Sequence, residues 1–162
     1  MSAAQLAWRP APHGNDAGHL LWHLARSQDA AVPRIGGERE AWQAELWETG
    51  GWRERFGRPT GEPQPGDHSA VVPLPLPSPT ELLGYLDATF ARAIAHVEGL
   101  AEAELDRALE PATAGESALT VAAQLRHLVT HANHHHGEPD YLRGLQQPGW
   151  DLPRGSGLRL PT

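Results

Sequence analysis

Five of the chain's ten histidines lie within the ten residues from 127 to 136. Three of them, His127, His131 and His135, are spaced by four, so on a helix they form one row with Cβ atoms about 6 Å apart. His131 and His135 follow Leu128 by three and seven positions, which places them on the side of the helix that faces the core. An imidazole there must be neutral and hydrogen-bonded, or bound to something. We interpret His131 and His135 as half of a metal site whose third ligand comes from elsewhere in the chain.

A simpler interpretation of the same pattern is a solvated surface pair, since two histidines four residues apart occur by chance in many helices. His134 and His136 point away from the row and are expected on the surface. For His127 two roles stay open, an outer group that supports a ligand or a core histidine with its own hydrogen bonds.

The third ligand is expected on a helix over residues 17–32. His23 lies beside Leu20 and Leu24 on the apolar stripe of that helix, so its side chain should point inward. His19, four residues earlier, is the competing candidate. A lone histidine on an apolar face is more often a core residue with satisfied hydrogen bonds, but the row of histidines near the C-terminus favours a ligand.

The composition predicts a single all-α domain of 162 residues, because leucine and alanine dominate and most β-forming residues are sparse. A formal net charge of −7 without a lysine or arginine run argues against nucleic acid or an anionic membrane as the main partner. The absence of cysteine excludes disulfides, thiolate ligands and cysteine nucleophiles. No apolar run approaches membrane-spanning length and no signal pattern is present, so we expect a cytoplasmic protein.

Capping residues and prolines set the predicted helix boundaries. Ser78 is an N-cap, Pro79 suits the first helical position and Glu81 completes a capping box. Asn15 or Asp16 and Thr120 cap two other helices. The predicted helical segments are 17–32, 38–48, 79–98, 101–109 and 121–145. The segments between and around them are a lead-in at 1–14, an aromatic segment at 52–56, a long irregular loop at 57–77 and a tail at 146–162.

Prolines and glycines mark the predicted breaks. Pro33, followed by Gly36 and Gly37, should end the first long helix, and Pro139 should kink or end the last one at the carbonyl of His135.

The packing residues follow from the same periodicity. The helix at 79–98 carries an apolar stripe that we expect in the core, formed by Leu82, Leu83, Leu86, Phe90, Ile94 and Val97. Arg26 and Asp29, three apart, are expected to pair on the surface. Four aromatic residues either pack over an end of the bundle or line a ligand pocket, namely Trp42, Trp47, Trp52 and Phe56.

Two stretches resemble the DinB-like (YfiT-like) metalloprotein superfamily. They are WRPAPHGNDAGHLLWHLARSQD at 8–29 and HANHHHGEPDYLRGL at 131–145, and the likeness extends from Gln5 to about Gly144. The resemblance implies a four-helix bundle with three histidine ligands for zinc or nickel. One ligand comes from the helix at 17–32 and two, four apart, from the last helix. Carried over to this chain, the ligands are His23, His131 and His135.

The chain departs from the family in its first helix, which is normally long and here has no room before the segment that resembles Gln5 to Pro12. Unless the true start lies upstream, we expect the gap to be filled by a short helix, by residues 38–56 or by a second subunit. An open gap would expose a wide apolar strip. We therefore expect a homodimer.

The resemblance implies a metal-dependent enzyme that activates a low-molecular-weight thiol, such as mycothiol, bacillithiol or glutathione, for attack on a small electrophile. Activation of water for hydrolysis is the sister interpretation, and His127, Glu138 or Asp140 could orient a ligand. The alternatives are a non-catalytic, metal-binding or stress-related bundle, and a structural bundle without metal.

Overall fold

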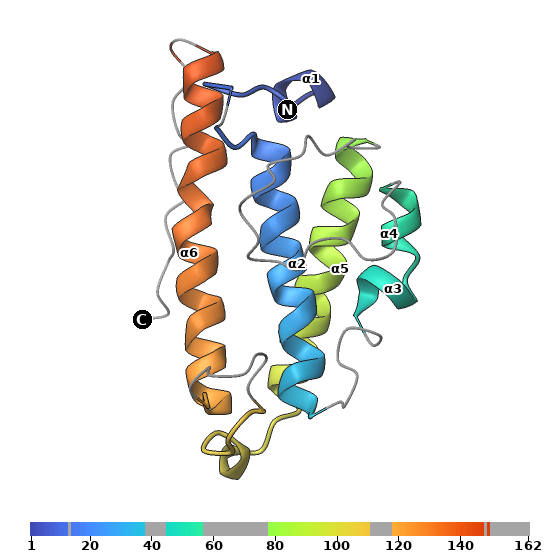
Figure 1. Ribbon diagram of the computed structural model, residues 1–162, viewed down its shortest axis with the longest axis vertical. Coiled ribbons are helices and arrows are strands. Elements are labelled where there is room, and N and C mark those ends of the chain that lie inside the picture. The colour runs from blue at the N-terminus through green and yellow to red at the C-terminus, as the bar shows by residue number, and fades with distance from the viewer. Residues whose placement is uncertain (13, 38–44, 57–77, 111–117, 148, 150–162) are drawn as a thin grey trace.

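The structure is a computed structural model, and it describes residues 1–12, 14–37, 45–56, 78–110, 118–147 and 149. Three long helices run alongside one another (Figure 1), namely α2 (Ala17–Gly36), α5 (Pro79–Glu98) and α6 (Val121–Gln146). Because α2 packs against both α5 and α6, it is the central helix of the three. The shorter elements are α1 (Ala3–Leu6), α3 (Leu46–Thr49), α4 (Trp52–Arg55) and the 3₁₀ turn η2 (Glu102–Glu104). These ranges contain no strand, so the predicted all-α bundle is confirmed.

Among the residues described ahead of α2, the structure contains the four-residue helix α1, which is the short helix that was one of the expected ways to fill the gap. The side chain of Ser2 caps α1, and Leu6 at its end is buried in the main apolar cluster. The side chain of Gln146, at the end of α6, donates a hydrogen bond to the carbonyl of Gln5 at 3.0 Å. These contacts hold α1 against the same end of the bundle as the last turn of α6 (Figure 1).

The predicted N-caps are confirmed for all three long helices. The side chain of Asp16 accepts a hydrogen bond from the backbone N–H of His19 at 2.7 Å, so Asp16 rather than Asn15 caps α2. Ser78 accepts from the N–H of Glu81 at 3.1 Å at the start of α5. Thr120 accepts from the N–H of Ala123 at 3.2 Å at the start of α6. The cap at Asp16 sets where α2 begins and therefore fixes the position of its histidines.

Both prolines that were predicted to interrupt helices lie inside them. α2 continues through Pro33 to Gly36 and ends at Gly37, whose φ of 76° is left-handed. α6 continues through Pro139 to Gln146, so of the two predicted outcomes at Pro139, a kink or an end, the end does not occur, and the predicted extent to residue 145 agrees with the structure. A proline inside a helix removes one N–H donor and costs stability. Pro33 is itself buried, and Leu142 is buried in the main apolar cluster one turn after Pro139.

The predicted helix at 101–109 is wrong apart from the turn η2. The backbone after η2 pairs with the segment before α6, since the N–H of Leu109 donates to the carbonyl of Leu119 at 2.7 Å. Val121 in turn donates to the carbonyl of Arg107 at 3.0 Å. The Arg107 side chain donates to the carbonyl of Ile35 near the end of α2. These hydrogen bonds between distant residues pair backbone N–H and C=O groups that would otherwise pair within a helix.

The aromatic residues form a packed cluster over one side of α2 and α5. Trp47, Phe56 and Tyr85 are almost completely buried, and the ring centroids of Trp47 and Tyr85 lie 5.4 Å apart. Trp52 packs on the same tyrosine at 5.4 Å. The described members of the predicted aromatic set therefore serve as packing residues, while Trp42 lies outside the described residues.

Arg26 and Asp29 are buried, which corrects the prediction that they pair on the surface. Asp29 is fully buried and accepts hydrogen bonds from the hydroxyl of Tyr85 and from the backbone N–H groups of Leu46 and Trp47, each at 2.7 Å. Arg26 pairs with Glu45 at 2.6 Å. This network ties the N-terminus of α3, and α5 through its tyrosine, to the central helix.

Burial in this network also shifts the acid–base properties of its members. Desolvation raises the pKa of Glu45, although the nearby Arg26 guanidinium acts in the opposite direction. Desolvation likewise raises the pKa of Tyr85, so its hydroxyl stays protonated and available to donate to Asp29.

The apolar stripe predicted for the core of α5 is only partly buried. Leu82 is buried with Tyr85 and Thr89, whereas three members of the predicted stripe are about half exposed. The exposed members are Leu83, Ile94 and Val97. The hydrogen bond from Tyr85 to Asp29 turns the face of α5 that carries Leu82, Tyr85 and Thr89 toward α2, which leaves the outer part of the stripe on the surface.

This orientation of α5 predicts that two adjacent leucines contribute very differently to stability. Replacing the fully buried Leu82 with alanine should destabilise the protein by about 2–5 kcal/mol, because the lost side chain leaves a cavity. Replacing Leu83, which is 50% exposed, should change stability by about 0.5 kcal/mol or less. Urea unfolding of the two variants measures both effects. Equal losses for the two positions would contradict this orientation of α5.

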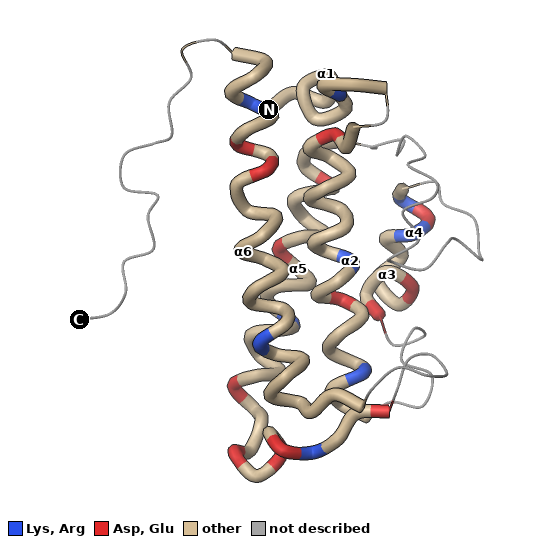
Figure 2. The backbone as a smooth tube through the Cα atoms, turned by 60° about the vertical axis from the view of Figure 1, so that its left-hand side comes forward, with Lys and Arg blue, Asp and Glu red and all other residues tan. Residues whose placement is uncertain are grey.

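Charged residues are interspersed along the described helices (Figure 2). Among the described residues, no helix is both long enough and apolar enough to cross a lipid bilayer.

Candidate metal centre

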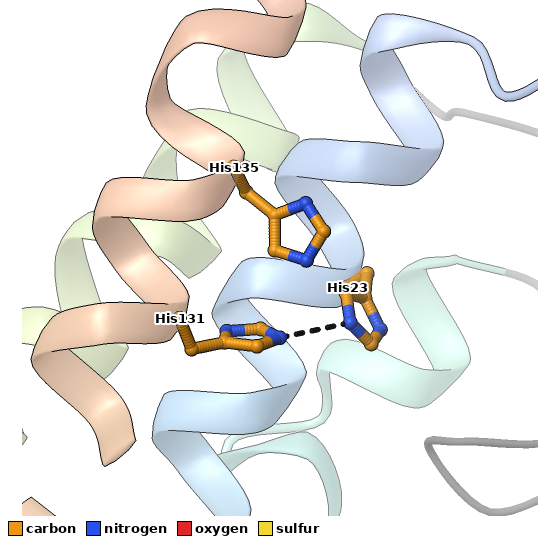
Figure 3. Close-up of side chains that lie close together, drawn as sticks. All are labelled: His23, His131 and His135. Atoms are coloured by element: carbon orange, nitrogen blue, oxygen red, sulfur yellow. Dashed lines mark hydrogen bonds between the residues drawn. The ribbon is translucent and has the colours of Figure 1, made fainter.

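Three histidines from two neighbouring helices converge between α2 and α6 (Figure 3). His23 lies in the middle of α2, and His131 and His135 lie one turn apart on α6. The Nε2 atoms of His23 and His131 are 3.1 Å apart. One nitrogen from each ring falls within 4.8 Å of the others, so this group could hold a metal ion. These are the three residues that the sequence predicted as ligands.

The spacing and tilt of the three rings suit a small divalent ion. Zinc bound to imidazole nitrogens at 2.0–2.1 Å in a tetrahedral site places its ligand atoms about 3.3 Å apart. The distance of 3.1 Å between the nitrogens of His23 and His131 is close to this value. The rings are inclined to one another by 58° to 85°, so they do not stack face to face. Three imidazole nitrogen donors with open positions fit zinc or nickel.

His131 is held in the form that binds metals. Burial lowers the pKa of His131 from its ordinary value of 6.5, and the neighbouring imidazoles His135 and His127 lower it further. The imidazole is therefore neutral at pH 7 and carries a lone pair. Its Nδ1 atom is buried and has no hydrogen-bond partner within the described part of the chain.

His135 is supported by a carboxylate. Its Nδ1 lies 2.5 Å from Oε2 of Glu138, which is three residues later on α6. The sequence left three candidates for such a supporting group, and the structure places one of them in contact. Of the other two candidates, His127 is exposed, with its ring centroid 5.7 Å from that of His131, and Asp140 is partly buried.

The other described histidines lie outside the group of three. His19 stacks on His23 with ring centroids 6.5 Å apart, but its nitrogens do not join the cluster. His134 and His136 are exposed, as predicted. His134 nevertheless belongs to a second, more exposed group with His135 and Glu138 that could also hold a metal ion. The sequence analysis missed this group, although the four-residue spacing of His134 and Glu138 was a signal for it.

Comparisons with known proteins agree with the fold and the family. The chain is similar to a solved structure described as the conserved protein of locus from Enterococcus faecalis, with a TM-score of 0.71 and 23% identity. The match covers 90% of this chain and 83% of that one, and it shows a shared fold. None of the curated proteins compared with this chain is detectably similar. Since residues 1–138 match the DinB superfamily over most of the sequence, the chain belongs to the DinB superfamily.

Proposed function

We propose that this chain is a metal-dependent enzyme that transfers a low-molecular-weight thiol, or water, to a small electrophilic substrate. The observation that supports the proposal is the convergence of His23, His131 and His135 within 4.8 Å between two packed helices. Three protein ligands leave open positions, which is the arrangement of catalytic zinc sites, whereas structural sites are closed by four ligands.

Each residue of the proposed site would have a distinct role. His23, His131 and His135 would hold zinc or nickel, and burial keeps His131 neutral for that role. When bound, a divalent ion lowers the pKa of a thiol or water at its open positions and so supplies a nucleophile at neutral pH. The carboxylate of Glu138 lies beside Nδ1 of His135 and can accept a hydrogen from it. Placement between α2 and α6 fixes both sides of the site on rigid elements.

A thiol is favoured over water as the nucleophile by the resemblance to S-transferases of the same superfamily. Nothing in the site itself separates the two, because fold and ligand set do not determine the reaction. The thiols to be tested are mycothiol, bacillithiol and glutathione.

Cobalt substitution tests the proposal directly. Cobalt-loaded protein should show d–d bands that shift when a thiol is added, and the zinc- or nickel-loaded protein should consume thiol in the presence of an activated aryl halide or a maleyl-type electrophile. Both signals should fall to background in His23→Ala and persist in His19→Ala. Metal binding without any response to thiols or electrophiles would instead support a non-catalytic metal-binding bundle.

A further inference from the structure

The contact between His135 and Glu138 determines which nitrogen of His135 is available to a metal. A carboxylate accepts hydrogen bonds, so Nδ1 of His135, 2.5 Å from Oε2 of Glu138, must carry the hydrogen. If the ring carries only that hydrogen, its lone pair is on Nε2. Figure 3 shows that the ring nitrogen of His135 remote from its Cβ points toward His23 and His131.

The two α6 histidines are supported unequally. Nδ1 of His135 has a carboxylate acceptor, whereas Nδ1 of His131 is buried and has none within the described residues. Each of these imidazoles must present Nε2 to bind the same ion, and each must then carry a hydrogen on Nδ1. For His131 that hydrogen is left buried without an acceptor, which costs free energy. For His135, the carboxylate of Glu138 is already in place to accept the same hydrogen in the metal-free protein.

We propose that Glu138 is a positioning residue that fixes the tautomer and ring orientation of His135 and thereby raises the affinity of the site for its metal. The inference rests on the metal site of the proposed function. A carboxylate that accepts from the remote nitrogen of a ligand histidine orients the ring and increases its basicity. Glu138 is suited to this task because its three-residue offset on α6 keeps it beside His135 while its own side chain stays 41% exposed.

The exposed group formed by His134, His135 and Glu138 offers a competing use of the same carboxylate. In that arrangement Glu138 would bind the metal itself, together with His134. Because the positioning role does not involve His134, replacing that residue separates the two uses.

The first experiment reads the tautomer of His135 in the metal-free protein by ¹⁵N NMR of the imidazole nitrogens. The wild type is expected to show His135 with hydrogen on Nδ1, and Glu138→Ala is expected to lose this preference. Hydrogen on Nε2 in the wild type would overturn the inference, whether or not the protein binds metal.

The second experiment measures zinc affinity of the full chain by competition with a chelator. Glu138→Ala should weaken binding by about 10–100-fold, as is typical for such outer partners, and Glu138→Gln should recover part of the loss because its amide oxygen still accepts. Asp140→Asn and His134→Ala, on the same helix, should bind like the wild type. Unchanged affinity in Glu138→Ala, or a loss in His134→Ala equal to that in Glu138→Ala, would overturn the proposal. No zinc binding by the wild type would overturn it together with the proposed function, whatever the tautomer of His135.

Discussion

Replacing Asp29 with alanine is expected to destabilise the protein by about 3–5 kcal/mol, the usual cost of removing one partner from a buried charged network. The carboxylate is fully buried and accepts three hydrogen bonds of 2.7 Å, two of them from the backbone at the start of α3 and one from Tyr85. It also lies 3.5 Å from Arg26 and 3.6 Å from Arg92. Alanine would leave the Tyr85 hydroxyl and the two backbone N–H groups at the start of α3 without this acceptor, while Arg26 would keep its pair with Glu45.

Urea unfolding followed by tryptophan fluorescence measures this loss, since Trp47 lies directly at the network. Asp87→Ala is a matched control, because Asp87 is exposed on α5, and it should change stability by about 0.5 kcal/mol or less. Tyr85→Phe removes one donor to Asp29 and should cost about 1–3 kcal/mol. A loss below about 1 kcal/mol for Asp29→Ala would show that the network does not hold α3 and α5 on the central helix.

Replacing His23 with alanine is expected to lower the affinity for zinc or nickel by more than about 100-fold. His23 is the only member of the three-histidine group that comes from α2, and its nitrogen lies 3.1 Å from that of His131. Replacing a group that supports a metal ligand commonly lowers the affinity for the metal by about 10–100-fold. The loss of a direct ligand should lower that affinity further.

The measurement is thermal unfolding with and without added metal. A ligand that binds only the folded state at 100 times its dissociation constant stabilises it by about 2.7 kcal/mol, so the wild type should melt at a clearly higher temperature with metal. His23→Ala should show no metal-dependent shift. His19→Ala, one turn away on α2, should keep the wild-type shift. A full shift in His23→Ala would remove His23 from the ligand set.

Local signals in the sequence predicted the helix starts and the members of the histidine group. Asp16, Ser78 and Thr120 form their caps through contacts within three residues, and such contacts can be predicted without knowledge of the fold. His131 and His135 were placed on one face by spacing alone. The choice of His23 over His19 depended on a single apolar stripe and on the family resemblance.

The rotation of α5 could not be predicted, because it depends on a contact between residues 56 positions apart. Apolar periodicity alone placed Leu83 and Ile94 in the core, whereas the hydrogen bond between Tyr85 and Asp29 turns a different face toward α2. The same reasoning misplaced Asp29, because an arginine and an aspartate three residues apart are typical of a solvent-exposed helix face.

The carboxylate that supports His135 was one of three candidates until side-chain positions were known. Glu138, His127 and Asp140 all lie within a few residues of the ligand pair on the same helix. Among the described residues, Glu138 is the candidate whose Oε2 atom contacts a ring nitrogen of His135. That choice depends on rotamers, which sequence spacing does not determine.

Metal analysis of the untagged protein tests the central claim most directly. A histidine tag would bind metal by itself, so it must be absent. The wild type is expected to carry about one zinc or nickel ion per chain, His135→Ala to lose it, and His136→Ala, at an exposed neighbouring position, to keep it. A wild-type protein that holds no metal, even after incubation with Zn²⁺ or Ni²⁺, would contradict the assignment of His23, His131 and His135 as a metal centre.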